Sequence, residues 1–215
     1  MGDNLRHMTS DVARATPGRT SERGAATRVA LLQAAREVFV DKGFAEAGVT
    51  DLVGRAQASV GSLYHHFSGK ADLYLALWEE FQTRQIQRTK RAVREARGSD
   101  PMAVFVAASR AYLDGALEER ELAALFLRGD GPPGFELVMR KAMSAWTERS
   151  AALFEDGFEG GDAAFAVVVT GALARAVSEI VLYGSEAESR RLAEDVLAII
   201  GQIQPVASAG GPSSG

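Results

Sequence analysis

The chain has 215 residues, 47% of them hydrophobic, and a formal net charge of −4. This length and composition predict a folded globular protein with a substantial buried core. The absence of cysteine excludes disulfides and thiolate metal sites. The sequence contains no run of about 18 uncharged apolar residues, and its first residues lack the apolar centre of a signal peptide. We therefore expect a cytoplasmic protein with no membrane partner.

The charges are distributed unevenly along the chain. Residues 1–97 contain 15 basic and 11 acidic side chains, a net charge of +4, whereas residues 98–215 contain 9 and 17, a net charge of −8. A basic N-terminal half can approach phosphate groups while an acidic C-terminal half stays away from them. This asymmetry favours a nucleic-acid partner for the N-terminal half.

Two polar ends enclose a chain with the composition of helices. Residues 1–18 lack periodicity and residues 206–215 are rich in Gly, Ser and Pro, so we expect both to be disordered tails. Between them the sequence is rich in Ala, Leu, Arg and Glu and has no alternating strand pattern. The predicted fold is therefore all-α, with about nine helices.

The first four predicted helices begin or end at residues suited to helix termini. The first spans residues 25–42, and Gly43 follows it as a left-handed cap; its apolar face contains Val29, Leu32, Ala35 and Phe39. Short helices at residues 48–55 and 59–67 flank a turn at 56–58, and the fourth helix spans residues 69–97. Two short helices supported by a longer one predict a helix-turn-helix domain over residues 19–77.

Five further helices are expected in a second domain, residues 78–205. Gly- and Pro-rich breaks separate helices at residues 101–118, 120–128, 133–156, 161–184 and 186–204. The basic residues from Arg84 to Arg97 surround the fourth helix, which favours a solvated surface over a second DNA contact.

The segment GSLYHHFSGKADLYLAL, residues 61–77, contains the side chains best suited to DNA binding. Small Gly61 and Ser62 would let the third helix enter a major groove deeply. Tyr64 and His65 have polar atoms that can reach phosphates or base edges. Lys70 adds a positive charge to the N-terminus of the next helix, where a phosphate can bind.

Residues 28–77 resemble the DNA-binding domain of the tetracycline repressor (TetR) family. The resemblance rests on AAREVFVDKGF, on VTDLVGRA, and on SVGSLYHHFSGKADL with its Gly61, Leu63, Tyr64, Phe67 and Lys70. It implies that the third helix reads DNA, and we expect Leu63 and Phe67 to be core residues that fix this helix against the first. The implied DNA-binding residues are Arg28, Thr50, Gln57, Ser59, Val60, Gly61, Ser62, Tyr64, His65 and Lys70.

Three positions depart from the family pattern. Gly48 replaces a capping Thr, which removes a side-chain contact but leaves a tolerable N-cap. Gln57 often corresponds to Gly in the family, and its amide can pair with adenine. Val60 often corresponds to a polar residue, so any reading of bases there would be apolar contact with a thymine methyl group.

The C-terminal half contains candidates for an apolar effector pocket and for a dimer interface. The pocket candidates are Phe105, Tyr112, Phe126, Met139, Met143, Trp146 and Phe165, although the same side chains could simply fill the core. In the family the last two helices usually form the dimer interface. The corresponding residues here are Val168, Gly171, Ala172, Ile180, Val196, Ile199 and Ile200.

These observations predict a homodimeric regulator that binds a palindromic operator and is released by a small, largely apolar molecule. A ligand-independent regulator or an activator of the same fold is the alternative. An enzyme is not expected, because all three histidines lie in the N-terminal part and no phosphate-binding glycine loop or metal-ligand cluster is present. No cofactor and no metal are predicted.

Overall fold

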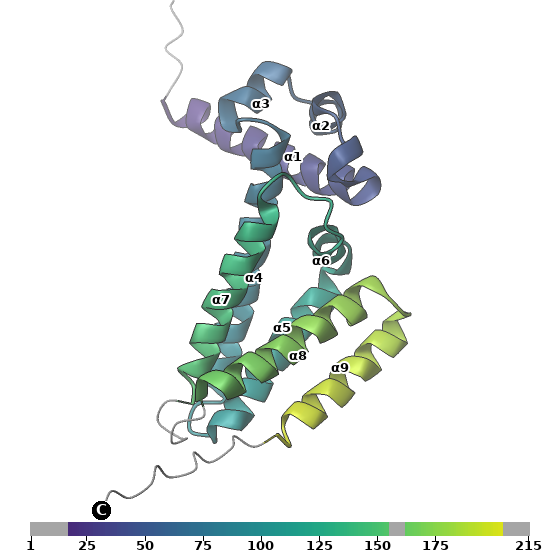
Figure 1. Ribbon diagram of the computed structural model, residues 1–215. Helices are drawn as coiled ribbons and strands as arrows, with labels where there is room; N and C mark the ends of the chain where they lie inside the picture. Colours follow the sequence, from purple (N-terminus) through teal and green to yellow (C-terminus); the bar gives the residue numbers. More distant parts are fainter. Residues whose placement is uncertain (1–16, 155–161, 204–215) are drawn as a thin grey trace, which may run out of the picture.

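The computed structural model describes residues 17–154 and 162–203. Within these ranges every regular element is a helix, which confirms the all-α prediction (Figure 1). The helices are α1 (Pro17–Glu46), α2 (Val49–Ala56), α3 (Val60–His66), α4 (Lys70–Glu95), α5 (Pro101–Glu118), α6 (Arg120–Leu127), α7 (Phe135–Ala151), α8 (Asp162–Leu182) and α9 (Glu186–Ile200).

Most helix termini lie where the sequence places them, because capping side chains define them locally. Ser59 and Ser185 each accept a hydrogen bond from a backbone N–H in the first turn of α3 and α9. Gly43 has a φ of 78°, so α1 bends there before its last residues. The N-terminus of α1 differs from prediction: it begins at Pro17, a residue suited to the first helical position, and includes the last two residues of the expected tail. The rest of both expected tails, residues 1–16 and 204–215, lies outside the described residues.

Helices α1, α2 and α3 form a compact unit around apolar side chains. Leu52, Leu63 and Phe67 are buried in one cluster with Ala35 and Phe39 of α1. The burial of Leu63 and Phe67 is as predicted. Val29 is 64% exposed, however, and is not a core residue. Residue 29 is one position too far around the helix to share the face of Leu31, Leu32 and Ala35.

A carboxylate fixes the first turn of α2. The Gly48 N–H donates a hydrogen bond of 3.0 Å to Oδ2 of Asp51, and the Lys42 ammonium lies 2.9 Å from Oδ1. The hydrogen bond from Lys42, followed by that from Gly48, lowers the pKa of Asp51 below its usual value. The capping threonine of the family pattern is therefore not required for this helix to begin at residue 49.

Helix α4 connects the two halves of the protein. It starts beside α3 and extends away from the N-terminal unit into the C-terminal bundle (Figure 1). It packs extensively on α5, so the predicted boundary at residue 77 falls inside one continuous helix.

Helix α8 lies within the C-terminal bundle and contacts α5, α6, α7 and α9. Its segment Ala164–Leu182 has a mean hydropathy of 1.8 and is, in the described residues, the one stretch long and apolar enough to cross a membrane. Half of this segment is buried in the protein, as in the core helix of a bundle, and it includes the charged residues Arg175 and Glu179.

Candidate DNA-binding face and effector cavity

The outer surface of α3 presents the side chains expected to read DNA. Val60 is 45% and Tyr64 is 57% exposed, and Gly61 and His65 are also exposed. Leu63, on the opposite side of the helix, is fully buried. The core therefore fixes α3 with its candidate contact residues directed outward.

Ser59 and Ser62 are partly committed to the helix itself. The Ser59 hydroxyl oxygen accepts a 3.0 Å hydrogen bond from the Ser62 N–H, and the two hydroxyl oxygens lie 2.9 Å apart. Gly61 is not required by internal packing, because a Cβ atom there would meet only the Ser59 hydroxyl, at 3.8 Å. Its missing side chain instead lets an external partner approach the backbone of α3.

The other candidate contacts surround this helix. Thr50 lies exposed in the first turn of α2, and Gln57 lies exposed in the turn between the two short helices with a left-handed φ of 51°. This backbone conformation explains why glycine suits position 57. Arg28 of α1 places its guanidinium 5.2 Å from the centre of the Phe67 ring and 4.0 Å from Glu80.

Lys70 has a structural role that the sequence did not indicate. Its ammonium donates hydrogen bonds of 2.9, 3.0 and 3.0 Å to the carbonyl oxygens of Phe44, Ala45 and Ala47. These three bonds occupy all the donors of an ammonium group. Lys70 thus binds the C-terminal end of α1 to the start of α4, and a phosphate contact would require it to leave these carbonyls.

The basic side chains at the start of the Arg84–Arg97 run are paired within the protein. Arg84 donates hydrogen bonds to the Glu119 carboxylate from Nε and Nη2, and Arg88 forms an ion pair with Glu118. Both partners lie at the end of α5 or directly after it. This agrees with a surface role for these two arginines.

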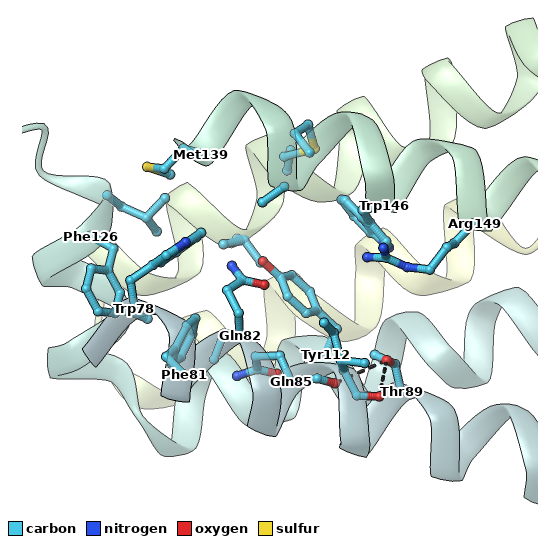
Figure 2. A pocket seen from close by; sticks show the side chains of 18 residues that line it. Trp78, Phe81, Gln82, Gln85, Thr89, Tyr112, Phe126, Met139, Trp146 and Arg149 are labelled. Atoms are coloured by element: carbon cyan, nitrogen blue, oxygen red, sulfur yellow. Dashed lines mark hydrogen bonds between the residues drawn. The ribbon is translucent and has the colours of Figure 1, made fainter. Parts of the chain in front are cut away.

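A cavity of about 100 Å³ lies between α4, α5, α6, α7 and α8 (Figure 2). Its wall is mainly aromatic and aliphatic, with two methionines. The lining residues are Trp78, Phe81, Gln82, Gln85, Ile86, Thr89, Tyr112, Ala116, Ala123, Phe126, Leu127, Met139, Ala142, Met143, Trp146, Arg149, Ala174 and Val177.

Five of the seven predicted pocket residues line this cavity: Tyr112, Phe126, Met139, Met143 and Trp146. The Tyr112 and Trp146 rings are stacked, with centroids 5.4 Å apart. The other two predicted residues, Phe105 and Phe165, are buried outside the cavity, and both pack against Phe154. Their assignment to the pocket was wrong, because they are core residues.

The contribution of α4 to this cavity was not predicted from the sequence. Trp78, Phe81, Gln82, Gln85, Ile86 and Thr89 all belong to that helix. The spacing of Trp78, Gln82, Gln85 and Thr89 at three and four residues places them on one helix face, which is the signal that could have revealed them.

Polar groups are few in the cavity wall. Figure 2 shows the Gln82 amide and the Tyr112 hydroxyl directed toward its centre, and Gln85 on the α4 side. Burial raises the pKa of Tyr112 to about 12, so its hydroxyl is protonated and neutral at physiological pH. Arg149 is the one charged lining residue, and it is solvent-exposed.

The predicted dimer residues divide into two groups. Val168 is 58% and Ile199 is 63% exposed, Gly171 and Ala172 are exposed, and Val196 is half-buried. Ile180 and Ile200 have exposures of 0% and 1% and belong to the core of the subunit, so their assignment to a dimer interface is corrected. Helical periodicity alone could not separate these faces, because α8 is apolar on both.

Contacts near Gly43 join the N-terminal unit to the cavity wall. The Phe44 N–H donates hydrogen bonds of 2.9 and 3.2 Å to the carboxylate of Asp130, which follows α6. The Tyr74 hydroxyl donates to the Leu125 carbonyl oxygen at 3.2 Å, and the Tyr74 ring lies 5.4 Å from that of Phe126, a cavity residue. Burial raises the pKa of Tyr74, which keeps this hydroxyl a donor.

A helix-turn-helix unit with an outward-facing third helix, joined to a helical bundle that contains a cavity, defines the class of helix-turn-helix DNA-binding proteins with a second, helical domain. Residues 31–77 match the family model described as bacterial regulatory proteins, tetR family. The N-terminal unit is therefore a DNA-binding domain of the TetR family. This is a family of regulators and not of enzymes.

The named relatives match only part of this chain. The HTH-type transcriptional activator FasR of Mycolicibacterium smegmatis is 42% identical over 64 residues, which are 30% of this chain and 29% of FasR. The transcriptional regulator AcuR of Cereibacter sphaeroides is 27% identical over 144 residues, 61% of this chain and 63% of AcuR. The chain thus matches less than two thirds of the length of each.

Solved structures share the fold over most of the chain. The fatty acid degradation regulator FadR from Bacillus halodurans has a TM-score of 0.69 at 15% identity, covering 88% of this chain and 97% of that one. A TerR/AcrR-family transcriptional regulator from Aquifex aeolicus has a TM-score of 0.65 at 19% identity, covering 81% and 97%. These likenesses show that the fold, with its C-terminal bundle, is shared with solved structures.

Proposed function

We propose that this protein is a cytoplasmic transcriptional repressor that binds palindromic operator DNA as a homodimer and dissociates when a small molecule enters the cavity. The observation that carries the proposal is the pairing of an exposed α3 face with a cavity joined to it through α6. Val60, Gly61, Tyr64 and His65 would face the major groove, with Thr50 and Arg28 near the phosphates.

The route for release runs through α6. Phe126 and Leu127 line the cavity, and three residues later Asp130 holds the Phe44 N–H at the end of α1. A ligand that displaces Phe126 would move Asp130 and, with it, the base of the helix-turn-helix unit. Because the coupling is reciprocal, operator DNA should weaken ligand binding by the same factor.

A homodimer is supported by the exposed apolar surface of α8 and α9. Val167, Val168 and Ile199 are each more than half exposed. Pairing of this surface with its copy by a two-fold axis would place two α3 helices toward successive major grooves. A palindromic operator follows from that symmetry.

An activator, or a regulator that needs no ligand, is the second candidate. It is supported by FasR, which is named an activator. In contrast, the relative BepR of Brucella suis, 34% identical over 59 residues, is named a repressor. Repression and activation differ in the position of the operator relative to the promoter, and not in how the protein binds DNA.

The test begins with selection of binding sites from a random duplex pool, followed by affinity measurements on the enriched site. Tyr64→Ala should weaken binding, whereas Tyr183→Ala, which alters a tyrosine of similar exposure (60% against 57%) at the end of α8, should not. Arg28→Ala should reduce the salt slope by about one unit. A library of small molecules is then screened for release of the operator complex. Failure to enrich a palindrome, or equal effects of both tyrosine variants, would contradict the proposal.

A further inference from the structure

Gln85 is an unpaired amide in the interior of the protein. Its side chain is 2% exposed, and neither Nε2 nor Oε1 has a hydrogen-bond partner among the described residues. It borders the cavity, as do Gln82 and Tyr112, whose side chains also make no hydrogen bond within the described part of the chain. A buried amide without a partner lowers stability, so its presence here calls for a ligand that completes it.

The neighbouring helix is adapted to this amide. A Cβ atom at Gly115 of α5 would lie 2.5 Å from Oε1 and 2.9 Å from Nε2 of Gln85, closer than real Cβ atoms approach. A glycine inside a helix is itself destabilising. The chain therefore combines two destabilising features at one point of the cavity wall. An apolar side chain at position 85 facing an alanine at position 115 would be more stable.

The chemistry of the wall specifies the ligand. A primary amide offers one acceptor and two donors, so both halves of Gln85 pair only with a group that presents a donor and an acceptor side by side. A carboxylate accepts only, which would leave Oε1 of Gln85 unpaired. Among the lining residues, the side chain that could pair with a carboxylate is Arg149, which lies exposed on α7.

The size of the cavity limits the rest of the molecule. Its volume of about 100 Å³ compares with the ~150 Å³ of an apolar cavity that binds benzene. Met139 and Met143 are flexible enough to admit a single ring.

We infer that the cavity binds a small uncharged molecule with a ring-sized apolar body and a planar amide-like head group, which pairs with Gln85, Gln82 and Tyr112. The inference rests on the proposed function, since it names the chemical class of the effector of the same cavity. The apolar body would lie among Trp78, Phe126 and Trp146.

The test compares three probes of similar shape, benzamide, benzoate and toluene, by isothermal titration of the full-length protein without DNA. Benzamide should bind at least about tenfold more tightly than the other two, because its amide forms buried hydrogen bonds with Gln85 that benzoate and toluene cannot complete. In Gln85→Met this preference should disappear, and the Tm of the unliganded protein should rise by several degrees because the unpaired amide is gone. Gln87→Met, which alters an exposed glutamine two residues along α4, should change neither property.

Several results would overturn the inference: equal binding of the three probes, tighter binding of benzoate, no heat from benzamide, or a Gln85→Met variant that keeps the preference. The outcome is separate from that of the proposed function, because the titration contains no DNA. Benzamide binding that leaves operator affinity unchanged would contradict the ligand-released repressor and leave the assignment of the cavity intact. Operator release by a ligand whose affinity does not depend on Gln85 would support the ligand-released repressor and contradict the role of Gln85 in the cavity.

Discussion

At the scale of single residues, Gly61 separates the requirements of folding from those of DNA binding. It lies inside α3, and a side chain there would meet no close atom of the protein. Gly61→Ala should therefore raise the free energy of unfolding by about 0.5–1 kcal/mol, the difference in helix propensity. The same substitution should weaken operator binding, because a methyl group would separate the α3 backbone from the groove.

Denaturant unfolding and fluorescence anisotropy with labelled operator measure these two effects of Gly61→Ala. Gly54→Ala is the matched control, since Gly54 lies inside α2 with no atom near its Cβ position. It should raise stability by a similar amount and leave DNA affinity unchanged. A Gly61→Ala variant that binds the operator as well as the native protein would show that α3 does not approach DNA closely at this residue.

Lys70 allows a second separation of roles at the residue scale. Because its ammonium binds three backbone carbonyls, Lys70→Met should lower the free energy of unfolding by about 1–3 kcal/mol in the absence of DNA. Thermal unfolding of the free protein measures this loss. A variant with native stability but weak operator binding would instead support the phosphate contact that the sequence suggested.

The exposure of the candidate DNA-contact residues was easier to predict from the sequence than the surroundings of Lys70 or Gln85. Exposure of Tyr64 and burial of Leu63 follow from positions on one short helix, which the sequence contains. The partners of Lys70 lie 23 to 26 residues away. The isolation of Gln85 depends on the whole bundle around it, so neither environment is encoded locally.

At the scale of elements, helix termini were predictable because their causes are local. Ser59, Ser185 and the pair Asp100-Pro101 stand at the starts of α3, α9 and α5. The assignment of helix faces was less accurate. Val29 and Ile200 were each assigned to the wrong environment, because an apolar residue is compatible with several faces until its neighbours are known.

The junction between α1 and α6 supports a prediction at this scale. A Cβ atom at Gly43 would collide with Oδ2 of Asp130, and the φ of 78° with a ψ of 173° is essentially restricted to glycine. Gly43→Ala should therefore cost about 2 kcal/mol or more of unfolding free energy and displace Asp130 from the Phe44 N–H. Amide hydrogen exchange at Phe44 should accelerate, and operator affinity should fall.

Gly98→Ala is the control for Gly43→Ala. Gly98 also has a positive φ, 93°, but its Cβ position is open. The Gly98→Ala variant should lose about 1 kcal/mol of unfolding free energy through backbone strain alone. Its amide hydrogen exchange at Phe44 and its DNA affinity should equal those of the native protein. Equal behaviour of the two variants would mean that the contact with Asp130 does not link the cavity wall to the helix-turn-helix unit.

At the scale of the whole molecule, the position of the cavity depends on how five helices meet. The sequence located its contributions from α5, α6 and α7 through their aromatic and methionine residues. The wall formed by α4 was missed because that helix was interpreted as part of the DNA-binding domain and then as a basic surface. This one helix begins in the helix-turn-helix unit and lines the cavity farther along its length.

The dimer proposal also belongs to this scale, and Ile199 tests it. Ile199 is 63% exposed, so Ile199→Glu leaves the subunit core unchanged and places a charge on the α8–α9 surface. The variant should be a monomer at concentrations where the native protein is a dimer. Its affinity for the palindrome should fall by about a hundredfold or more. In a dimer, binding of one helix-turn-helix unit holds the second unit at a high effective concentration near its half-site, and a monomer lacks this effect. Analytical ultracentrifugation and operator titration measure the two effects.

Leu137→Glu, which alters a 52% exposed residue of α7, is the control and should change neither the oligomeric state nor the operator affinity. A dimeric Ile199→Glu together with a monomeric Leu137→Glu would place the interface on α7, and the separation of the two α3 helices would then have to be derived from that contact.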